Sequence, residues 1–528
     1  MRLSLARVLA LALAAALVVP IATLAQEPRM GGTVVQAISA DPPTMNPATT
    51  TDTQAWSLMG KLFNGLTYLD NDYRSHPDLA ESWTISPDGL TYTFKLRKDV
   101  KWHDGKPFTS ADVKWTYQEA IAKYHPVGRV AYASIASIDT PDPYTVVLKM
   151  KTPFGPTVFM TSLNMGPILP KHLLEGQDLA TAEFNRKPVG TGPFKIAEAV
   201  KGSHYVLERN PDYFKKGRPY LDRVILKVMP NPASRVLAFE KGEVDVLYSF
   251  FLPREQAGRV KALPGIVVKE YMLFPETILL FFNLKDNKAL GDVRVRQAIF
   301  HGIDQSFLVQ QGYAGQGRPG TSVIPSSLAW AYNANVPKYP FDVAKAGALF
   351  DEAGYPKNAQ GERMALRLVY DPANSAANRA SEVVAQQLKG VGLNVKLVPL
   401  ERSLMLEKVF KQYDFDLYIH NYTSYGDPAL GIGRIYTCDN IRPAPFVNVE
   451  RYCNPKVDEL FAKGGAVASQ AERAKPYREV QEILMKDLPT IPLVEYGDTN
   501  VARARVQNIF KSLSSHERWD EVWVTDGK

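Results

Sequence analysis

Cysteine is scarce in this chain: 528 residues contain only Cys438 and Cys453. They are not spaced as CxxC and no histidine lies near them, which argues against a redox or metal pair. The eight histidines are dispersed, with no two closer than 22 residues, which excludes a local HExxH zinc pair. GxSxG, SxxK and Walker A sequences are also missing. These absences disfavour an enzyme, although a secreted hydrolase whose acidic residues come together from distant positions stays open as an alternative.

Long apolar runs are lacking beyond the first residues of the chain. Val8 to Val19 form an apolar run of 12 residues, shorter than the roughly 20 residues of a membrane-spanning helix. Arg2 and Arg7 precede this run and small residues follow it at 23–25, which is typical of a cleavable signal peptide over residues 1–25. No cysteine follows the run to accept a lipid. We therefore expect an exported, soluble, periplasmic protein without a lipid anchor.

A strong excess of one charge is missing as well. The formal net charge is +7, and it becomes 7 − 2 = +5 once residues 1–25, with two arginines and no acid, are removed. The charges are interspersed, so neither a nucleic acid nor a membrane surface is indicated as a partner. About 500 residues exceed one core and predict two or three domains. In an oxidising compartment, Cys438 and Cys453 are expected to form a structural disulfide.

Hydrophobic patterning divides the chain near residue 283. The part before it is rich in predicted strands, and the part after it alternates helices with short apolar strands. That alternation predicts an α/β lobe with a mixed or parallel sheet, and the tail at 499–528, which loses the alternation, is compatible with a return to the first lobe. The predicted strands are 33–39, 91–97, 144–150, 204–209, 222–229, 266–271, 365–370, 393–398 and 414–420, and the predicted helices are 292–303, 342–353, 378–389, 401–411 and 472–487.

Two short motifs invite a catalytic interpretation that their context does not support. Gly315, Gly317 and Gly320 satisfy GxGxxG, but a helix-like stretch precedes them and prolines follow. A dinucleotide site needs a strand before the glycines and a helix after them, so we expect a connecting loop. His103 and Asp104 stand between a predicted strand and a helix start, where a turn and a cap explain them better than acid/base work.

Several ordered sequence blocks carry a family resemblance. The residues at 79–117, LAESWTISPDGLTYTFKLRKDVKWHDGKPFTSADVKWTY, are followed by VGTGPF at 189–194, ERNPDYF at 208–214 and KGEVD at 241–245. FNLKDNKALGDVRVRQAIFHGID at 282–304 and YGDP at 425–428 continue the series. With these blocks the chain resembles family 5 of extracellular solute-binding proteins, which includes dipeptide, oligopeptide, nickel, sugar and opine binders.

The resemblance implies an α/β, periplasmic-binding-protein-like fold of type II, with two lobes, a hinge between them and an extra β-rich subdomain. It implies a discontinuous lobe I at 30–64, 190–281 and 495–528, an inserted subdomain at 65–189, and lobe II at 282–494. The expected function is the periplasmic substrate-binding component of an ABC importer, not an enzyme. A monomer without cofactor is expected to deliver a small polar organic solute to permease subunits in the inner membrane.

Two anchors of peptide-binding relatives are replaced in this chain. The resemblance implies an aspartate that binds the peptide ammonium, but this chain has Ser424 at that position. It also implies an arginine that binds the ligand carboxylate, but this chain has Asp371 there. Both losses argue against a free dipeptide, and leave a modified peptide, an opine or an oligosaccharide. Aromatic side chains suit such solutes, although packing is the alternative role for each. The candidate binding residues are Asn46, Thr53, Trp56, Trp330, Tyr332, Asp371, Tyr422, Ser424, Tyr425 and Asp427.

A metal chelate or haem is the alternative cargo, as in the nickel-binding members of the family. Such a cargo needs histidine, methionine or carboxylate ligands that converge on the cleft. His420, at the end of the predicted strand 414–420, keeps this alternative open. No residue is assigned as a metal ligand.

Overall fold

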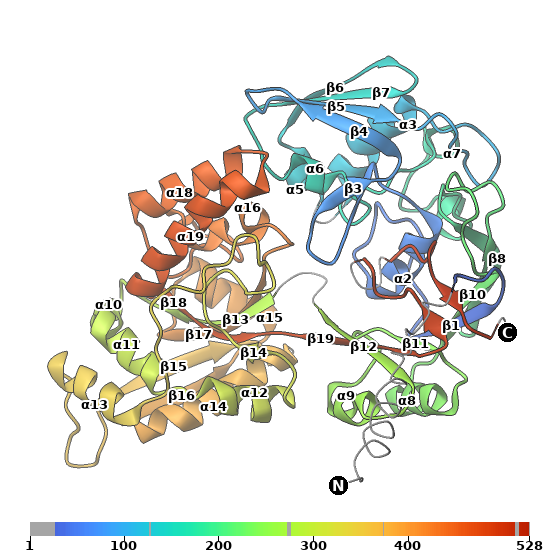
Figure 1. Cartoon of the computed structure of the whole chain (residues 1–528). Helices are drawn as coiled ribbons and strands as arrows, with labels where there is room; N and C mark the ends of the chain where they lie inside the picture. The colour runs from blue at the N-terminus through green and yellow to red at the C-terminus, as the bar shows by residue number, and fades with distance from the viewer. Residues whose placement is uncertain (1–26, 126–127, 272–275, 373, 513–516, 527–528) are drawn as a thin grey trace, which may run out of the picture.

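The computed structural model describes residues 27–125, 128–271, 276–372, 374–512 and 517–526. The predicted signal peptide lies outside these residues. Two bodies stand side by side in Figure 1, each built on its own large sheet, and a smaller sheet belongs to the body that contains the first strand. No helix within the described ranges is long and apolar enough to cross a membrane.

The first body is built on a seven-stranded sheet of order β12-β19-β11-β1-β10-β9-β8. Strand β1 is parallel to β10 and β11, and the other pairs are antiparallel. Helices α8 and α9 lie below this sheet in Figure 1. The tail of the chain does return here as β19. The elements are β1 (Thr33–Ile38), α2 (Thr53–Leu62), β8 (Phe194–Val200), β9 (His204–Arg209), β10 (Arg223–Val228), α8 (Pro232–Lys241), β11 (Val246–Leu247), α9 (Arg254–Lys261), β12 (Ile266–Tyr271) and β19 (Asp498–Arg503).

Between β1 and β8 the chain forms a four-stranded antiparallel sheet of order β4-β5-β7-β6. Tyr92, Phe94 and Leu96 are buried on one face of β5 while Lys95 is exposed, as the alternation at 91–97 predicts. The helix start expected after His103 and Asp104 is also confirmed: α3 begins at Ser110, and the Thr109 N–H donates to the Asp112 carboxylate. The elements are β2 (Thr67–Leu69), β3 (Ser75–Pro77), β4 (Ala80–Ile85), β5 (Thr91–Leu96), α3 (Ser110–Trp115), α4 (Ala122–Tyr124), α5 (Gly128–Tyr132), β6 (Ile135–Asp142), β7 (Thr145–Met150), α6 (Thr157–Met160) and α7 (Lys171–Leu174).

The second body carries a six-stranded sheet of order β14-β18-β13-β17-β15-β16. Strand β15 is parallel to β16 and β17, whereas β13 is antiparallel to both its neighbours. Asp342 caps a helix as predicted, accepting from the Lys345 N–H at 2.8 Å. The strands are β13 (Glu276–Phe282), β14 (Arg318–Pro319), β15 (Met364–Tyr370), β16 (Leu393–Pro399), β17 (Leu417–Thr423) and β18 (Thr490–Glu495). The longer helices are α11 (Val293–His301), α12 (Gln305–Tyr313), α13 (Val343–Glu352), α14 (Ser375–Gly390), α18 (Pro455–Ala466) and α19 (Gln470–Asp487), and the short ones are α10 (Lys288–Gly291), α15 (Arg402–Met405), α16 (Pro428–Gly431) and α17 (Gly433–Tyr436).

Strand β13 lies at the boundary expected at 281/282. Strand β13 pairs along its whole length with β17 and also with β18, so its seven residues belong to the second body. The chain therefore passes between the bodies twice, once between β12 and β13 and once between β18 and β19. Figure 1 shows β19 and β12 extending toward the second body.

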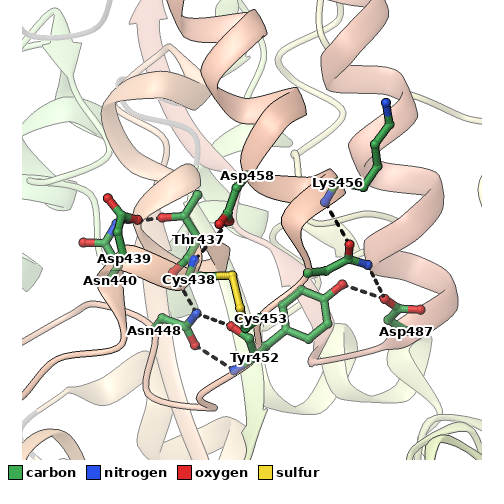
Figure 2. Close-up of a disulfide and its surroundings, with 11 residues drawn as sticks. Thr437, Cys438, Asp439, Asn440, Asn448, Tyr452, Cys453, Lys456, Asp458 and Asp487 are labelled. Atoms are coloured by element: carbon green, nitrogen blue, oxygen red, sulfur yellow. Dashed lines mark hydrogen bonds between the residues drawn. A yellow bond between two sulfur atoms is a disulfide. The ribbon is translucent and has the colours of Figure 1, made fainter.

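Cys438 and Cys453 form the predicted disulfide, which spans 15 residues. Figure 2 shows it among hydrogen bonds that tie the loop to neighbouring helices. The Cys438 N–H donates to Asp458 of α18 at 3.0 Å, and the Tyr452 hydroxyl donates to Asp487 of α19 at 2.6 Å. The bridge therefore fastens a loop of the second body to its outer helices.

Removing this bridge with the pair C438S/C453S is expected to lower stability by about 3 kcal/mol, the chain-entropy contribution of a loop of about 15 residues. Thermal unfolding of the variant and of the reduced parent protein measures the loss. Solute affinity should stay the same, because the bridge lies in one body only. A weaker affinity at unchanged stability would contradict this structural role.

Candidate functional site

A cavity of about 490 Å³ lies between the two bodies, next to the end of β12 and to the crossing between β18 and β19. Its first wall combines the end of β12 and the start of β19 with the loop between β2 and β3. Its second wall is the loop after α12 together with the end of β18. The lining residues are Asn71, Asp72, Tyr73, Lys269, Glu270 and Thr499 on the first side, Gly315, Gln316, Gly317, Arg318, Ser327 and Glu495 on the second, and Tyr496 and Gly497 at the crossing.

A larger hollow of about 1270 Å³ exists elsewhere, between the loop at 41–45, the segment 180–189 and strand β8. All its lining residues lie in the first body and its inserted sheet. Motion of one body against the other would not close it. The cavity between the bodies is therefore the better candidate site.

The GxGxxG loop forms part of the cavity wall. It follows helix α12 directly, and the two-residue strand β14 lies inside the motif, between Gly317 and Gly320; the segment connects α12 to the sheet, as predicted, and does not have the strand-glycine-helix order of a dinucleotide site. The Gln316 side chain reaches across to the first body, where its Nε2 donates to the Arg254 carbonyl at 2.7 Å. A Cβ at Gly317 would lie 2.6 Å from the Glu495 carbonyl. A residue without a side chain is therefore needed where this loop meets β18.

Glu495 ends β18 with its side chain turned into the cavity wall. It is 1% exposed. Its Oε2 accepts from Arg318 Nε at 2.8 Å and from Ser326 Oγ at 2.6 Å. Its Oε1 is buried and has no hydrogen-bond partner among the described residues. The next residue, Tyr496, lies under the Arg254 guanidinium, 3.9 Å from the ring centroid.

Of the predicted candidates at 422–427, Tyr422 lies in β17, and Ser424, Tyr425 and Asp427 belong to the loop after it. Ser424 is fully buried, and its Oγ accepts from the Gly426 N–H at 3.4 Å. Tyr425 has the left-handed φ of 51°, and its ring lies 5.8 Å from the Arg434 guanidinium. A Cβ on Gly426 would come within 2.8 Å of Tyr73, a lining residue of the cavity. The loop thus touches the cavity wall through Tyr73.

Asp427 is engaged by a partner that the sequence does not reveal. Its carboxylate accepts from Arg473 Nη1 at 2.7 Å and from Nη2 at 2.5 Å, and both side chains are buried. Burial opposes the charge of Arg473, but attraction to Asp427 outweighs it and raises the pKa of the guanidinium above its ordinary value. Asp427 also caps α16. Its role in the structure is to hold α19 against the loop.

Trp330 and Tyr422 each place an unpaired polar atom inside the second body. Trp330 packs edge-on against Tyr477 at 5.7 Å, and Tyr422 packs on Phe281 at 5.0 Å. Trp330 Nε1 and the Tyr422 hydroxyl are buried without a hydrogen-bond partner among the described residues. The Tyr332 hydroxyl, by contrast, is paired with Thr321 Oγ1 at 2.8 Å. Neither Trp330, Tyr332 nor Tyr422 lines the cavity itself.

The other candidates lie away from the cavity lining. Asn46 is buried and donates to Asn185 at 3.1 Å, Thr53 begins α2, and the Trp56 ring meets Phe250 at 6.5 Å. Asp371 follows β15 and lies 3.9 Å from the Arg402 guanidinium. Each of these contacts lies within a single body. Sequence reasoning missed Tyr73, Gln316, Arg318, Glu495 and Tyr496, although Glu495 and Tyr496 directly follow an apolar strand, a common place for binding groups.

His420 is enclosed by aromatic rings. It stacks on Tyr418 and Phe446, and Asn374 lies 3.2 Å from its Nδ1. Burial lowers the pKa of His420 to about 4, so the imidazole is neutral. Across the described ranges there is no cluster of three or more His, Cys, Asp or Glu side chains suited to a metal ion.

Two α/β bodies, joined by two crossings and enclosing a cavity between them, define a two-lobed solute-binding protein. Residues 74–442 match the bacterial extracellular solute-binding proteins, family 5 (middle), and the chain belongs to this family. It is similar to the oligopeptide-binding protein AppA of Bacillus subtilis, with 29% identity over 88% of this chain and 86% of that protein. It is 28% identical to the glutathione-binding protein GsiB of Escherichia coli, over 92% of each chain.

The fold is also similar to that of a solved structure. HbpA2 from Haemophilus parasuis superimposes with a TM-score of 0.82 at 26% identity, covering 93% of this chain and 100% of that one. The predicted two-lobe α/β fold is thereby confirmed. The chain is a substrate-binding component of an ABC importer.

Proposed function

We propose that this protein captures a small polar organic solute in the periplasm, encloses it in the cavity between its lobes, and delivers it to permease subunits in the inner membrane. The observation that carries the proposal is the cavity of about 490 Å³ with walls from both lobes. Its size falls in the range of about 300–1,000 Å³ that is usual for small-molecule sites. A peptide-like compound, an opine or an oligosaccharide would fit this polar lining.

Closure of the lobes on the solute is the proposed mechanism. Direct contacts already join the inserted sheet region to lobe II: the Gly155 N–H donates to the Gly465 carbonyl at 2.7 Å, and Phe159 lies against Gly426. A solute shifts the equilibrium toward the closed form only by its higher affinity for that form. Contacts from both walls supply this difference in affinity, because a solute can contact only one wall when the lobes are apart.

We propose lobe I as 30–64, 190–271 and 496–528, the inserted subdomain as 65–189, and lobe II as 276–495.

We retain four candidate solute contacts: Tyr422, Ser424, Tyr425 and Trp330. They are supported by the link from Gly426 to Tyr73, and by the polar atoms of Tyr422 and Trp330 that have no partner among the described residues. We further propose a monomer, exported by residues 1–25, that binds without turnover. Mass spectrometry of a bound solute after prolonged incubation would overturn the last point by detecting a product.

Native mass spectrometry of the protein purified without a tag is expected to show one retained small molecule per chain. Adding that molecule back to stripped protein at about 100 times its dissociation constant should stabilise the fold by about 2.7 kcal/mol. A thermal-shift titration measures this effect. If no molecule is retained and no peptide, sugar or opine shifts the midpoint, the proposed function is wrong. Metal analysis of the same sample tests the metal-chelate alternative.

A further inference from the structure

A row of polar atoms crosses lobe II where its strands reach the cavity. Strand β13 lies between β17 and β18, and Thr277 stands opposite Tyr422 on one side and Glu495 on the other. Directly opposed residues of antiparallel strands point to the same face of a sheet. Thr277 Oγ1, the Tyr422 hydroxyl and Glu495 Oε1 are all buried, and none has a hydrogen-bond partner in the described part of the chain.

The row reaches the cavity at Glu495. Glu495 and Ser327 both line the cavity, and Ser327 Oγ is a further buried atom without a partner among the described residues. Buried polar atoms in folded proteins almost always have hydrogen-bond partners. Thr277 and Tyr422 lie outside the cavity lining, but the atoms of Glu495 and Ser327 belong to it, and they indicate the place where a solute supplies the missing partners.

The Glu495 carboxylate is oriented before any solute binds. Arg318 and Ser326 hold its Oε2, so Oε1 is left for a further donor. The Arg318 side chain is 55% exposed, and the charge of the buried carboxylate is shared with a group that is largely in solvent. Charge-assisted hydrogen bonds to a buried carboxylate are about twice as strong as neutral ones. A cationic donor gains most from this position.

We infer that Glu495 anchors a primary ammonium or guanidinium group of the solute, with Oε1 as acceptor. The inference deepens the proposed function and rests on it. Asp427 is already paired with Arg473, and Ser424 carries no charge. The aspartate that the resemblance implies would lie in the loop after β17, whereas the inferred cation site lies at the end of β18, on the other side of β13. The opposite wall carries Asp72, Lys269 and Glu270, and its two carboxylates are paired with Arg74 and Lys261, which leaves Glu495 Oε1 as the acceptor for a cation from the solute.

The test uses matched solutes that differ only in an amino group. The pairs are trialanine and its desamino analogue, glutathione and its desamino analogue, and glucosamine and 2-deoxyglucose. Isothermal titration calorimetry on the full mature protein should show, for at least one pair, binding of the amine that is at least ten-fold tighter. Glu495→Gln keeps the side-chain shape and removes the charge, so it should bring the two affinities of that pair within about two-fold.

Glu479→Gln serves as the matched control, because it makes the same change from carboxylate to amide on an exposed side chain of α19 that does not line the cavity. It should keep the preference for the amine, and thermal unfolding should show that both variants are folded. Equal affinities within every pair in the parent protein, or an unchanged preference in Glu495→Gln, would overturn the inference. Failure of every amine to bind would overturn it too, whereas the proposed function is judged separately by the molecule retained after purification.

Discussion

Gly155→Ala is expected to weaken solute binding about 100-fold while leaving each lobe folded. A Cβ at this position would lie 2.3 Å from the Val467 carbonyl and 2.9 Å from Arg473 Nε, both in lobe II. The Gly155 N–H also donates to Gly465 across the same gap. A methyl group there forces the subdomain and lobe II apart. Each 1.4 kcal/mol lost from the closed form lowers the apparent affinity ten-fold.

Gly258→Ala provides the control, because nothing lies within 4 Å of a Cβ at that helical position. It should leave affinity unchanged. Small-angle X-ray scattering should show a larger radius of gyration for Gly155→Ala than for the control, in the presence of saturating solute for the parent. Parent-like affinity and radius in Gly155→Ala would show that the contact between the subdomain and lobe II plays no part in closure.

Arg473→Met is expected to reduce the unfolding free energy of lobe II by about 3–5 kcal/mol, the usual cost of leaving one partner of a buried ion pair alone. The substitution leaves the Asp427 carboxylate buried at the start of α16, with no cation beside it. Urea unfolding followed by tryptophan fluorescence measures the change, since the Trp330 ring lies 5.2 Å from the Arg473 guanidinium.

The double variant D427N/R473M should regain at least half of that loss, because it removes the uncompensated charge. Lys463→Met, which breaks an exposed pair with Glu459 on α18, should leave the urea midpoint unchanged. Equal instability of the single and double variants would indicate that packing of the long arginine side chain, and not the charge, is what matters at Arg473.

Helices and strands were predictable where a few consecutive residues contain the pattern that identifies them. The alternation at 91–97 determined both the strand and its buried face, and Asp342 marked a helix start that the structure has one residue later, at Val343. The partners of strand β13 were harder to predict. The residues ETILLFF form an almost continuous apolar run, which predicts burial on both faces, but its partners β17 and β18 lie far along the chain.

The site was harder to predict, because its residues, like the partners of β13, come together from distant parts of the chain. Aromatic side chains drew attention to Tyr422 and Trp330, and both have unpaired polar atoms in the structure. Asp427 was selected as a candidate binding residue, and its partner Arg473 stands on a separate helix that the sequence does not bring to it. Glu495 was missed because its surroundings depend on Thr277 and Arg318, which only the register of β13 and β14 brings to it.

The sheet of lobe I also constrains the order in which the protein can assemble. Strand β12 joins that sheet only through β19, and β19 is among the last strands to be synthesised. The lobe begun by β1 therefore stays incomplete until nearly the entire chain has emerged. Contacts between such distant segments form slowly, so we expect the sheet of lobe I to be completed only after the strands of lobe II have been synthesised.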